Sequence, residues 1–267
     1  MNRTQKILSL IQSKGEGLEI GPCHAPVAPK SEGFNVKVID HADRPTLIEK
    51  YTGHGVDLEK IEDVDYVWNG ESYRELIGST NHFDWIIASH VVEHTPDFIS
   101  FLKDCSGLLK PSGVLALAIP DKRLCFDHFR PITGLSRIID AHYEKRTRHS
   151  PGSNAEFYLN AISKGGKLGW DESETGEIEF IHSPAEAQIK MRESMTASDY
   201  QDLHSWCFTL DSFRLLVHDL NSLGLSDFKE TQCYPTDGCE FIIGLSKHGS
   251  GIPCDRTEFL RSFSHEY

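Results

Sequence analysis

The sequence predicts an α/β fold: a doubly wound, mostly parallel sheet of seven strands, closed by an antiparallel strand pair. Short apolar runs alternate with polar, helix-like segments over the first 120 residues, which is the order that parallel strands with crossover helices require. Residues 83–88 are almost entirely apolar, as in a strand that is buried on both faces of a sheet. Two late strand-like runs are joined by a short turn, which is typical of a hairpin.

Five strands are expected in the first 120 residues, and most of them end at a turn-forming or acidic residue. They cover residues 15–20, 35–39, 64–68, 83–88 and 114–119. A helix is expected between the last two, because Phe98, Leu102 and Cys105 recur at helical spacing. A short amphipathic helix is also expected within residues 1–14.

The alternation breaks in the middle of the chain. Residues 121–205 are polar, contain Gly- and Ser-rich turns, and are too long for an ordinary connection, so we expect a mainly helical inserted cap. A helix over 211–223 should follow it, because its apolar residues share one face. The remaining expected parts are strands at 227–234 and 240–246, a main domain of residues 15–120 and 206–249, and a tail at 250–267.

Composition narrows the classes of partner and the compartment. The formal net charge of -13 disfavours a nucleic-acid partner, because phosphate polyanions repel an acidic protein. The seven cysteines are dispersed and form no Cys-x-x-Cys pair, which indicates reduced thiols and a cytoplasmic protein. No apolar run is long enough for a membrane span, and the first residues do not resemble a secretory leader. The oligomeric state stays open.

The first expected strand leads into a turn that is typical of a nucleotide-type cofactor site. The stretch Leu18-Glu19-Ile20-Gly21-Pro22 passes from an apolar strand through an acidic residue to a glycine and a proline. Asp40 ends the next expected strand, nineteen residues after Gly21. An acidic side chain at that distance is positioned to bind both hydroxyls of a ribose.

Further segments complete a resemblance to a known family. Ser89-His90-Val91-Val92-Glu93-His94 follows the fourth expected strand, and Ile119-Pro120-Asp121-Lys122-Arg123 closes the fifth. With the Gly21 loop, this ordered set resembles the class I S-adenosylmethionine-dependent methyltransferases. Within them it is similar to small bacterial enzymes that are linked to surface-polysaccharide and sugar biosynthesis. The resemblance implies a Rossmann-like fold and S-adenosylmethionine as cofactor.

Carried over position by position, the resemblance implies the cofactor-binding residues. They are Glu19, Gly21, Pro22, Asp40, Asn69, Ser89 and His90. The family's loop usually continues with further glycines, whereas Cys23 and Ala25 stand here. This departure motivates an alternative, a non-catalytic cofactor-binding or scaffolding protein with the same fold. A nicotinamide-dependent sugar enzyme is disfavoured by the loop and by the closing strand pair.

Methyl transfer to a hydroxyl or amine needs a group that removes the acceptor's proton. The catalytic candidates by position are His90, Asp121 and His204, and His94 is a fourth. We favour His90, because it stands where the family places the reacting methyl group. The alternative for each is structural: a turn cap for Asp121, and packing on a neighbouring tryptophan for His204.

The same segment contains a pattern of metal ligands. His90-x-x-Glu93-His94 matches inverted zinc peptidases, but it runs into a proline turn instead of lying on a helix. Some methyltransferases of the class hold a divalent metal with Glu-x-x-Glu-His at this position, and here His90 replaces the first Glu. His204 would be an additional ligand. We predict no metal and leave this alternative open.

The inserted cap is expected to select the acceptor. It is locally basic, which is compatible with a clamp for a phosphorylated or nucleotide-linked sugar, although a solvated helix face is the slightly favoured explanation of these charges. Its cations near the start are Lys122, Arg123, Arg130, Arg137, Lys145, Arg146 and Arg148, and its aromatic residues include Tyr143, Phe157, Tyr158 and Trp170. The sequence therefore predicts a methyltransferase for a small carbohydrate-type acceptor, with oxygen ranked before nitrogen as the methylated atom.

Overall fold

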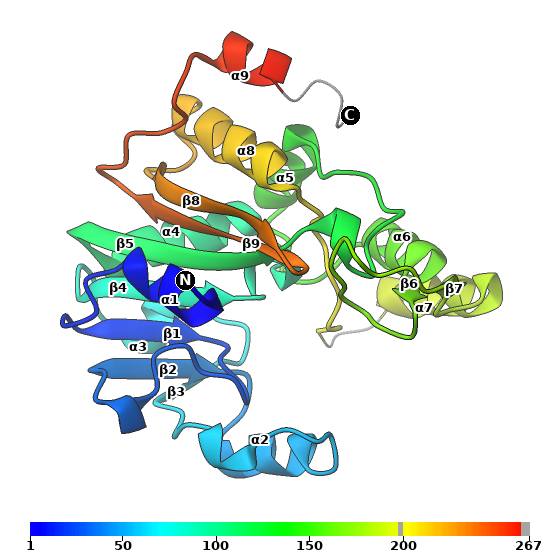
Figure 1. Ribbon diagram of the computed structural model, residues 1–267, viewed down its shortest axis with the longest axis horizontal. Coiled ribbons are helices and arrows are strands. Elements are labelled where there is room, and N and C mark those ends of the chain that lie inside the picture. The colour runs from blue at the N-terminus through cyan, green and yellow to red at the C-terminus, as the bar shows by residue number, and fades with distance from the viewer. Residues whose placement is uncertain (197–199, 263–267) are drawn as a thin grey trace.

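A seven-stranded sheet in the order β3-β2-β1-β4-β5-β9-β8 organises the chain (Figure 1). The structure is a computed structural model, which describes residues 1–196 and 200–262. The strands are β1 (Gly17–Ile20), β2 (Val36–Asp40), β3 (Tyr66–Val67), β4 (Phe83–Ser89), β5 (Leu109–Pro120), β8 (Lys229–Asp237) and β9 (Glu240–Ser246). Strand β9 pairs antiparallel with β5 and β8, whereas the other neighbours are parallel. The predicted fold class is confirmed.

Polar side chains fix where the main helices begin. Asp97 and Thr209, for example, accept a backbone N–H of the first turn and so satisfy donors that a helix leaves unpaired. The helices of the main body are α1 (Arg3–Ser9), α2 (Arg44–Tyr51), α3 (Tyr73–Ile77), α4 (Phe98–Leu108), α5 (Leu135–Tyr143), α8 (Leu210–Ser222) and α9 (Arg256–Ser262).

Strand β4 shows why the sheet is buried on both faces. Its successive side chains point to opposite sides, as in any strand. Ile86 and Ala88 join the large core under α4, α5 and α8, whereas Trp85 and Ile87 join a second core that includes Ile7 of α1. All four strand residues are at most 1% exposed. The nearly continuous apolar run therefore reflects burial of both faces of β4.

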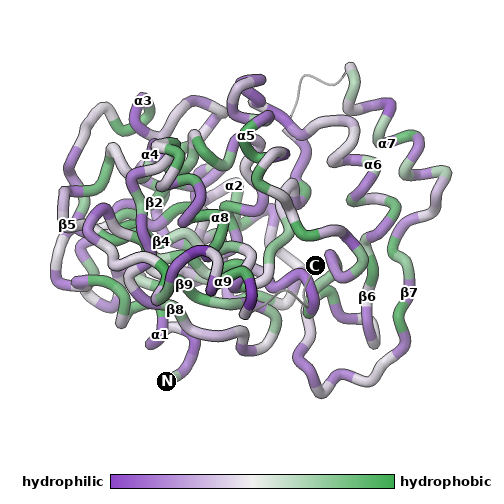
Figure 2. The backbone as a smooth tube through the Cα atoms, turned by 90° about the horizontal axis from the view of Figure 1, so that it is seen from above, coloured by the Kyte–Doolittle hydropathy of each residue, from purple (hydrophilic) through white to green (hydrophobic). Residues whose placement is uncertain are grey.

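The insertion consists of two unlike parts. Helix α5 packs on α4 and buries Ile138 and Ala141 in the main core. The outer part contains α6 (Pro151–Asn160), β6 (Ile162–Lys164), β7 (Ile178–Phe180) and α7 (Pro184–Thr196), and β6 pairs antiparallel with β7. This outer part forms a group beside the main body in both views (Figures 1 and 2). The cap is thus mainly helical with a small strand pair.

Several elements differ from the expected ranges. Strand β3 is only two residues long, Tyr66–Val67. Asp65, just before it, binds Val38 N–H, Lys30 and Lys37 through its carboxylate. The tail contains α9, which buries Phe259 against Leu215. Among the described residues, no helix combines the length and apolar character needed to cross a bilayer.

Candidate active site

A cavity of about 870 Å³ lies at the carboxyl ends of β1, β2 and β4. Open α/β sheets bind ligands at this edge, where the loops after the strands converge. Two segments of the insertion also line the cavity, near residues 142–147 and 200–202. The part of the molecule predicted to hold the cofactor and the part predicted to hold the acceptor therefore share one cavity.

The loop after β1 is shaped by Gly21 and Glu19. Gly21 lines the cavity with φ at +64°, and a Cβ there would lie 3.1 Å from Val91 Cγ2. Glu19 is buried beneath the loop, where its carboxylate accepts the N–H groups of Val27 at 2.6 Å and Ala28 at 3.1 Å. Burial raises the pKa of Glu19 to about 7. Glu19 thus holds the loop in place without lining the cavity.

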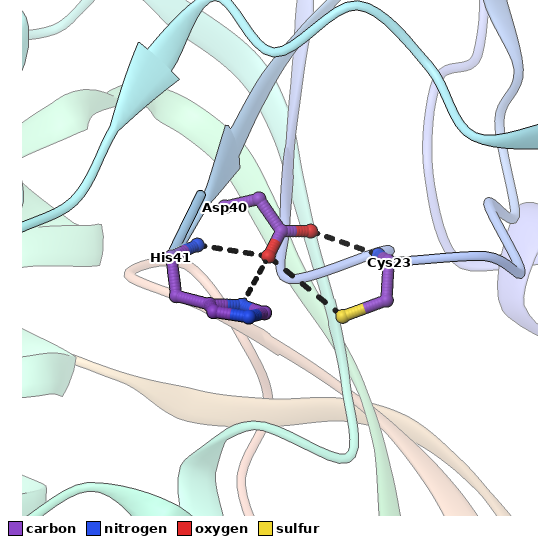
Figure 3. Close-up of side chains that lie close together, drawn as sticks. All are labelled: Cys23, Asp40 and His41. Atoms are coloured by element: carbon purple, nitrogen blue, oxygen red, sulfur yellow. Dashed lines mark hydrogen bonds and ion pairs between the residues drawn. The ribbon is translucent and has the colours of Figure 1, made fainter. Parts of the chain in front are cut away.

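Asp40 lines the cavity, and Cys23 and His41 contact its carboxylate (Figure 3). Oδ2 accepts the Cys23 N–H at 2.9 Å, and Oδ1 lies 2.6 Å from His41 Nδ1. Hydrogen bonding to Asp40, and then to Cys23, raises the pKa of His41 to about 9. Cys23 takes φ +49°, a left-handed conformation that permits these contacts. Cys23, which stands where the family usually has a glycine, therefore orients Asp40, the residue predicted to bind the ribose.

The other predicted cofactor residues lie around the cavity without lining it. Pro22 is buried in the loop, and Asn69 is exposed while its neighbours Trp68 and Gly70 contribute to the wall. The Ser89 hydroxyl accepts a hydrogen bond from Arg3 of α1. These three positions stay predictions as cofactor contacts.

His90 lines the cavity immediately after β4 and takes φ +54°. Its Nε2 lies 2.7 Å from Glu240 Oε2, and Arg3 holds the same carboxylate at 2.5 Å through Nε. Burial alone would lower the pKa of His90, but the hydrogen bond to Glu240 keeps it above its ordinary value. His90 thus combines a strained backbone with a side chain that residues of α1 and β9 hold in place, and such a combination is typical of a functional position.

The imidazole rings of His94 and His204 lie next to each other at the floor of the cavity. Their ring centroids are 4.5 Å apart, but only His94 contributes to the cavity lining. His204 is 4% exposed, and its Nδ1 lies 2.5 Å from Asp127 Oδ2. Burial raises the pKa of Asp127, but His204 and then Arg130 outweigh that effect and hold it at about 2. His204 is thus firmly oriented but shielded from the cavity.

Asp121 lies away from the cavity lining. It is fully buried at the end of β5, where Arg123 and the Thr236 hydroxyl donate to its carboxylate at 2.7 Å each. These contacts are those of the structural turn cap that the sequence left as the alternative. The geometry does not favour Asp121 as a base.

The cations of the insertion do not form a single clamp. Arg130 and Arg137 both bind Glu156, and Arg130 also binds Asp127. Lys145 and Arg146 do line the cavity, although Arg146 also pairs with Glu144. Of the aromatic candidates, Tyr143 lines the cavity, whereas Phe157, Tyr158 and Trp170 pack within the insertion.

A family profile described as a methyltransferase domain matches residues 2–221. The match covers all strands up to β5, the insertion and most of α8. The chain belongs to this methyltransferase family. Its residues 2–221 form a methyltransferase domain.

Known proteins resemble parts of this methyltransferase. A ubiquinone biosynthesis O-methyltransferase of Actinobacillus pleuropneumoniae is 28% identical over 130 residues, 44% of this chain and 53% of that protein. One of Xanthomonas oryzae pv. oryzae is 36% identical over 87 residues, 32% of this chain and 34% of that protein. The chain thus spans about half or less of these relatives. A putative S-adenosylmethionine-dependent methyltransferase of Listeria monocytogenes aligns with TM-score 0.45 and 11% identity over 91% of this chain and 97% of that one.

The residues of the cavity fit S-adenosylmethionine. The positive φ of Gly21 brings backbone without a side chain to the cavity wall, as a cofactor loop requires. Asp40 Oδ2 accepts the Cys23 N–H and keeps a second lone pair for a ribose hydroxyl. Trp68 and Phe101 add flat apolar surface nearby, which suits a purine ring.

Several residues of this site were not found from the sequence. Glu240 comes from β9, and it reaches His90 because β9 pairs with β5 in a register that sets Pro120 opposite Glu240. His41 follows Asp40 directly, so its position was visible but its contact was not. Tyr200 and Asp202 line the cavity from the end of the insertion, where no regular pattern marked them.

Proposed function

We propose that this methyltransferase methylates a hydroxyl oxygen of a small, ring-containing acceptor. The observation that carries the proposal is His90, which lines the cavity after β4 with Nε2 held by Glu240. An oxygen acceptor also agrees with the printed name of the relatives, O-methyltransferase. The predicted ranking of oxygen before nitrogen is kept.

The chemistry divides between the cofactor and the chain. S-adenosylmethionine supplies a methyl group that is already activated, so the protein must align the acceptor oxygen and remove its proton. The Glu240 contact keeps the ring proton of His90 on Nε2, so Nδ1, which lies 3.6 Å from Glu93 Oε1, is the nitrogen left to take the acceptor's proton. Arg3 holds Glu240 and thereby fixes the plane of the imidazole.

Two acceptor classes follow from different observations. The relatives' name favours a phenolic hydroxyl of a quinol-type ring. Tyr143 and Tyr200 line the cavity together with Lys145 and Arg146, and this combination supports a sugar that carries an anionic group. We rank the phenolic class first and retain the carbohydrate class, with its link to polysaccharide biosynthesis, as second.

We further propose the insertion as the acceptor-binding cap and the cytoplasm as the compartment. The insertion contributes both its residues near 142–147 and its residues near 200–202 to the cavity. All seven cysteines, each within the described ranges, are free thiols, which supports a reducing compartment.

The test is transfer of a radiolabelled methyl group to two acceptor panels, catechols and other phenols in one, sugar nucleotides and sugar phosphates in the other. We expect turnover with the first panel, and turnover with the second alone would favour the carbohydrate class. Calorimetric titration with S-adenosylmethionine runs beside it. Binding without transfer to any oxygen or nitrogen acceptor would instead support the scaffolding alternative.

His90→Ala completes the test. It should bind the cofactor with unchanged affinity and lose at least about a hundredfold in turnover, because a general base contributes on that order. Full turnover by this variant would remove His90 from the mechanism.

A further inference from the structure

Glu93 is a buried carboxylate with no hydrogen-bond partner on either oxygen among the described residues. It lies in the 3-10 turn Val92–His94 and is 1% exposed. A buried carboxylate is costly unless it is paired or binds a metal ion.

Three imidazoles place a nitrogen near this carboxylate. His90 Nδ1 lies 3.6 Å from Glu93 Oε1, His204 Nε2 lies 3.9 Å from it, and His94 Nε2 lies 4.0 Å from it. These distances are too long for hydrogen bonds. Glu93, His94 and His204 each offer one ligand atom within 4.8 Å of the other two. Ligands about 2.0–2.2 Å from a common ion stand roughly 3.3–3.6 Å apart, so only small movements would bring the three onto one ion.

The outer nitrogens of both histidines face carboxylates. His94 Nδ1 lies 2.8 Å from Asp202, and His204 Nδ1 lies 2.5 Å from Asp127. Arg130 holds Asp127 in turn at 2.6 Å. The hydrogen bond to Asp127 keeps the His204 proton on Nδ1 and leaves the Nε2 lone pair available, as in histidines that bind metals. Asp202 forms an ion pair with His94, whose Nδ1 makes no hydrogen bond among the described residues.

We propose that Glu93, His94 and His204 bind a divalent transition-metal ion, Zn²⁺ or Mn²⁺, in the floor of the cavity. Three protein ligands leave an open position, which is the arrangement of catalytic metal sites. His94 lines the cavity, so an ion held by these residues would be accessible from it. The role of the ion, to bind the acceptor oxygen next to His90, rests on the proposed function. The proposal that the ion binds does not rest on that function. This proposal departs from the prediction, made from the sequence, that no metal is bound.

A second cluster, Cys23, Asp40 and His41, also groups three ligand atoms (Figure 3). It differs from the Glu93 site because its carboxylate is already satisfied by both neighbours. We therefore place the ion at Glu93, and Cys23 supplies the control.

The experiment titrates the chelator-treated full chain with Zn²⁺ by calorimetry and with Co²⁺ by visible absorption. We expect one ion per chain and a cobalt spectrum without a thiolate charge-transfer band, because the ligands are nitrogen and oxygen. Cys23→Ser and His142→Ala, which alter a thiol and a second cavity-lining histidine, should bind the ion as the wild type does. Glu93→Gln and His204→Ala should not bind it.

Asp202→Asn guards against misfolding of the buried variants. Its side chain is 72% exposed. Its loss should weaken binding of the ion 10- to 100-fold, because His94 loses the contact that orients its ring. A folded wild type without stoichiometric binding would overturn the proposal, as would binding that is lost in Cys23→Ser and kept in His204→Ala. Methyl transfer by metal-free protein would remove the ion's catalytic role alone. Metal binding without transfer to any acceptor would contradict the proposed function and leave the site intact.

Discussion

Glu19 holds the predicted cofactor loop through a single buried side chain. Its two oxygens accept two N–H groups of the loop that follows Gly21. In Glu19→Gln, one oxygen becomes an amide NH₂ that faces a backbone donor, so we expect the free energy of unfolding to fall by about 1–3 kcal/mol. Urea denaturation measures this loss. Glu16→Gln, at a partly exposed position next to the same strand, should change stability by less than about 0.5 kcal/mol. Equal stabilities of the two variants would contradict this role for Glu19.

Glu240 is a positioning residue for His90. Glu240→Gln keeps the shape of the side chain but weakens the charged contact with His90 Nε2. We expect kcat to fall about tenfold or more while the dissociation constant of S-adenosylmethionine stays the same, because the imidazole loses its orientation and the cofactor loop is untouched. Steady-state kinetics and calorimetry separate the two quantities. A raised dissociation constant with unchanged kcat would show a cofactor role instead.

At the scale of elements, the turn between β1 and the cofactor loop depends on one backbone conformation. Gly21→Ala places a Cβ at φ +64° and 3.1 Å from Val91 Cγ2. We expect a loss of about 1 kcal/mol in stability and a weaker affinity for S-adenosylmethionine. Gly224→Ala is the matched control, since it has φ +70° in open space after α8. It should lose similar stability and bind the cofactor normally. The same affinity in both variants would mean that the Gly21 turn does not contact the cofactor.

The order of elements was predictable because its signals are local. Strand β4 is read from consecutive apolar residues, and α8 from apolar spacing after the Thr209 cap. Asp40 and His90 were found in the same way, since each directly follows or ends a strand. The contacts that define the site were not predictable. Glu240 reaches His90 across 150 positions of the chain, and only the pairing register of β9 with β5 sets that distance.

At the scale of the whole molecule, a buried hydrogen bond joins the two segments that flank the outer part of the insertion. The segment before α6 carries His149, which is 4% exposed and hydrogen-bonded to the hydroxyl of Ser205, beyond α7. Arg130 and Arg137 add contacts to Glu156 of α6. The basic residues of the insertion therefore serve mainly its own structure, and a phosphate clamp would rest on Lys145 and Arg146.

The burial of His149 predicts how the stability of the protein depends on pH. Burial, and then the charge of His94, lowers the pKa of His149 from 6.5 to about 4, although Asp202 acts in the opposite direction. Below pH 6.5 the unfolded chain takes up a proton that the folded chain refuses, so stability is fully present above that pH and is lost as the pH falls toward 4. One pKa unit is worth about 1.4 kcal/mol, so His149 should remove about 2 kcal/mol between about pH 7.5 and about pH 5.

The variant His149→Gln isolates this contribution. A neutral amide can still bond to Ser205 but does not titrate, so the variant should lose about 2 kcal/mol less than the wild type over the same range. Urea denaturation at a series of pH values measures both slopes, and the difference between them cancels the titration of every other group. If the slopes of wild type and His149→Gln coincide, His149 is protonated in the folded chain, and the segments that flank the outer part of the insertion are not joined through a buried neutral imidazole.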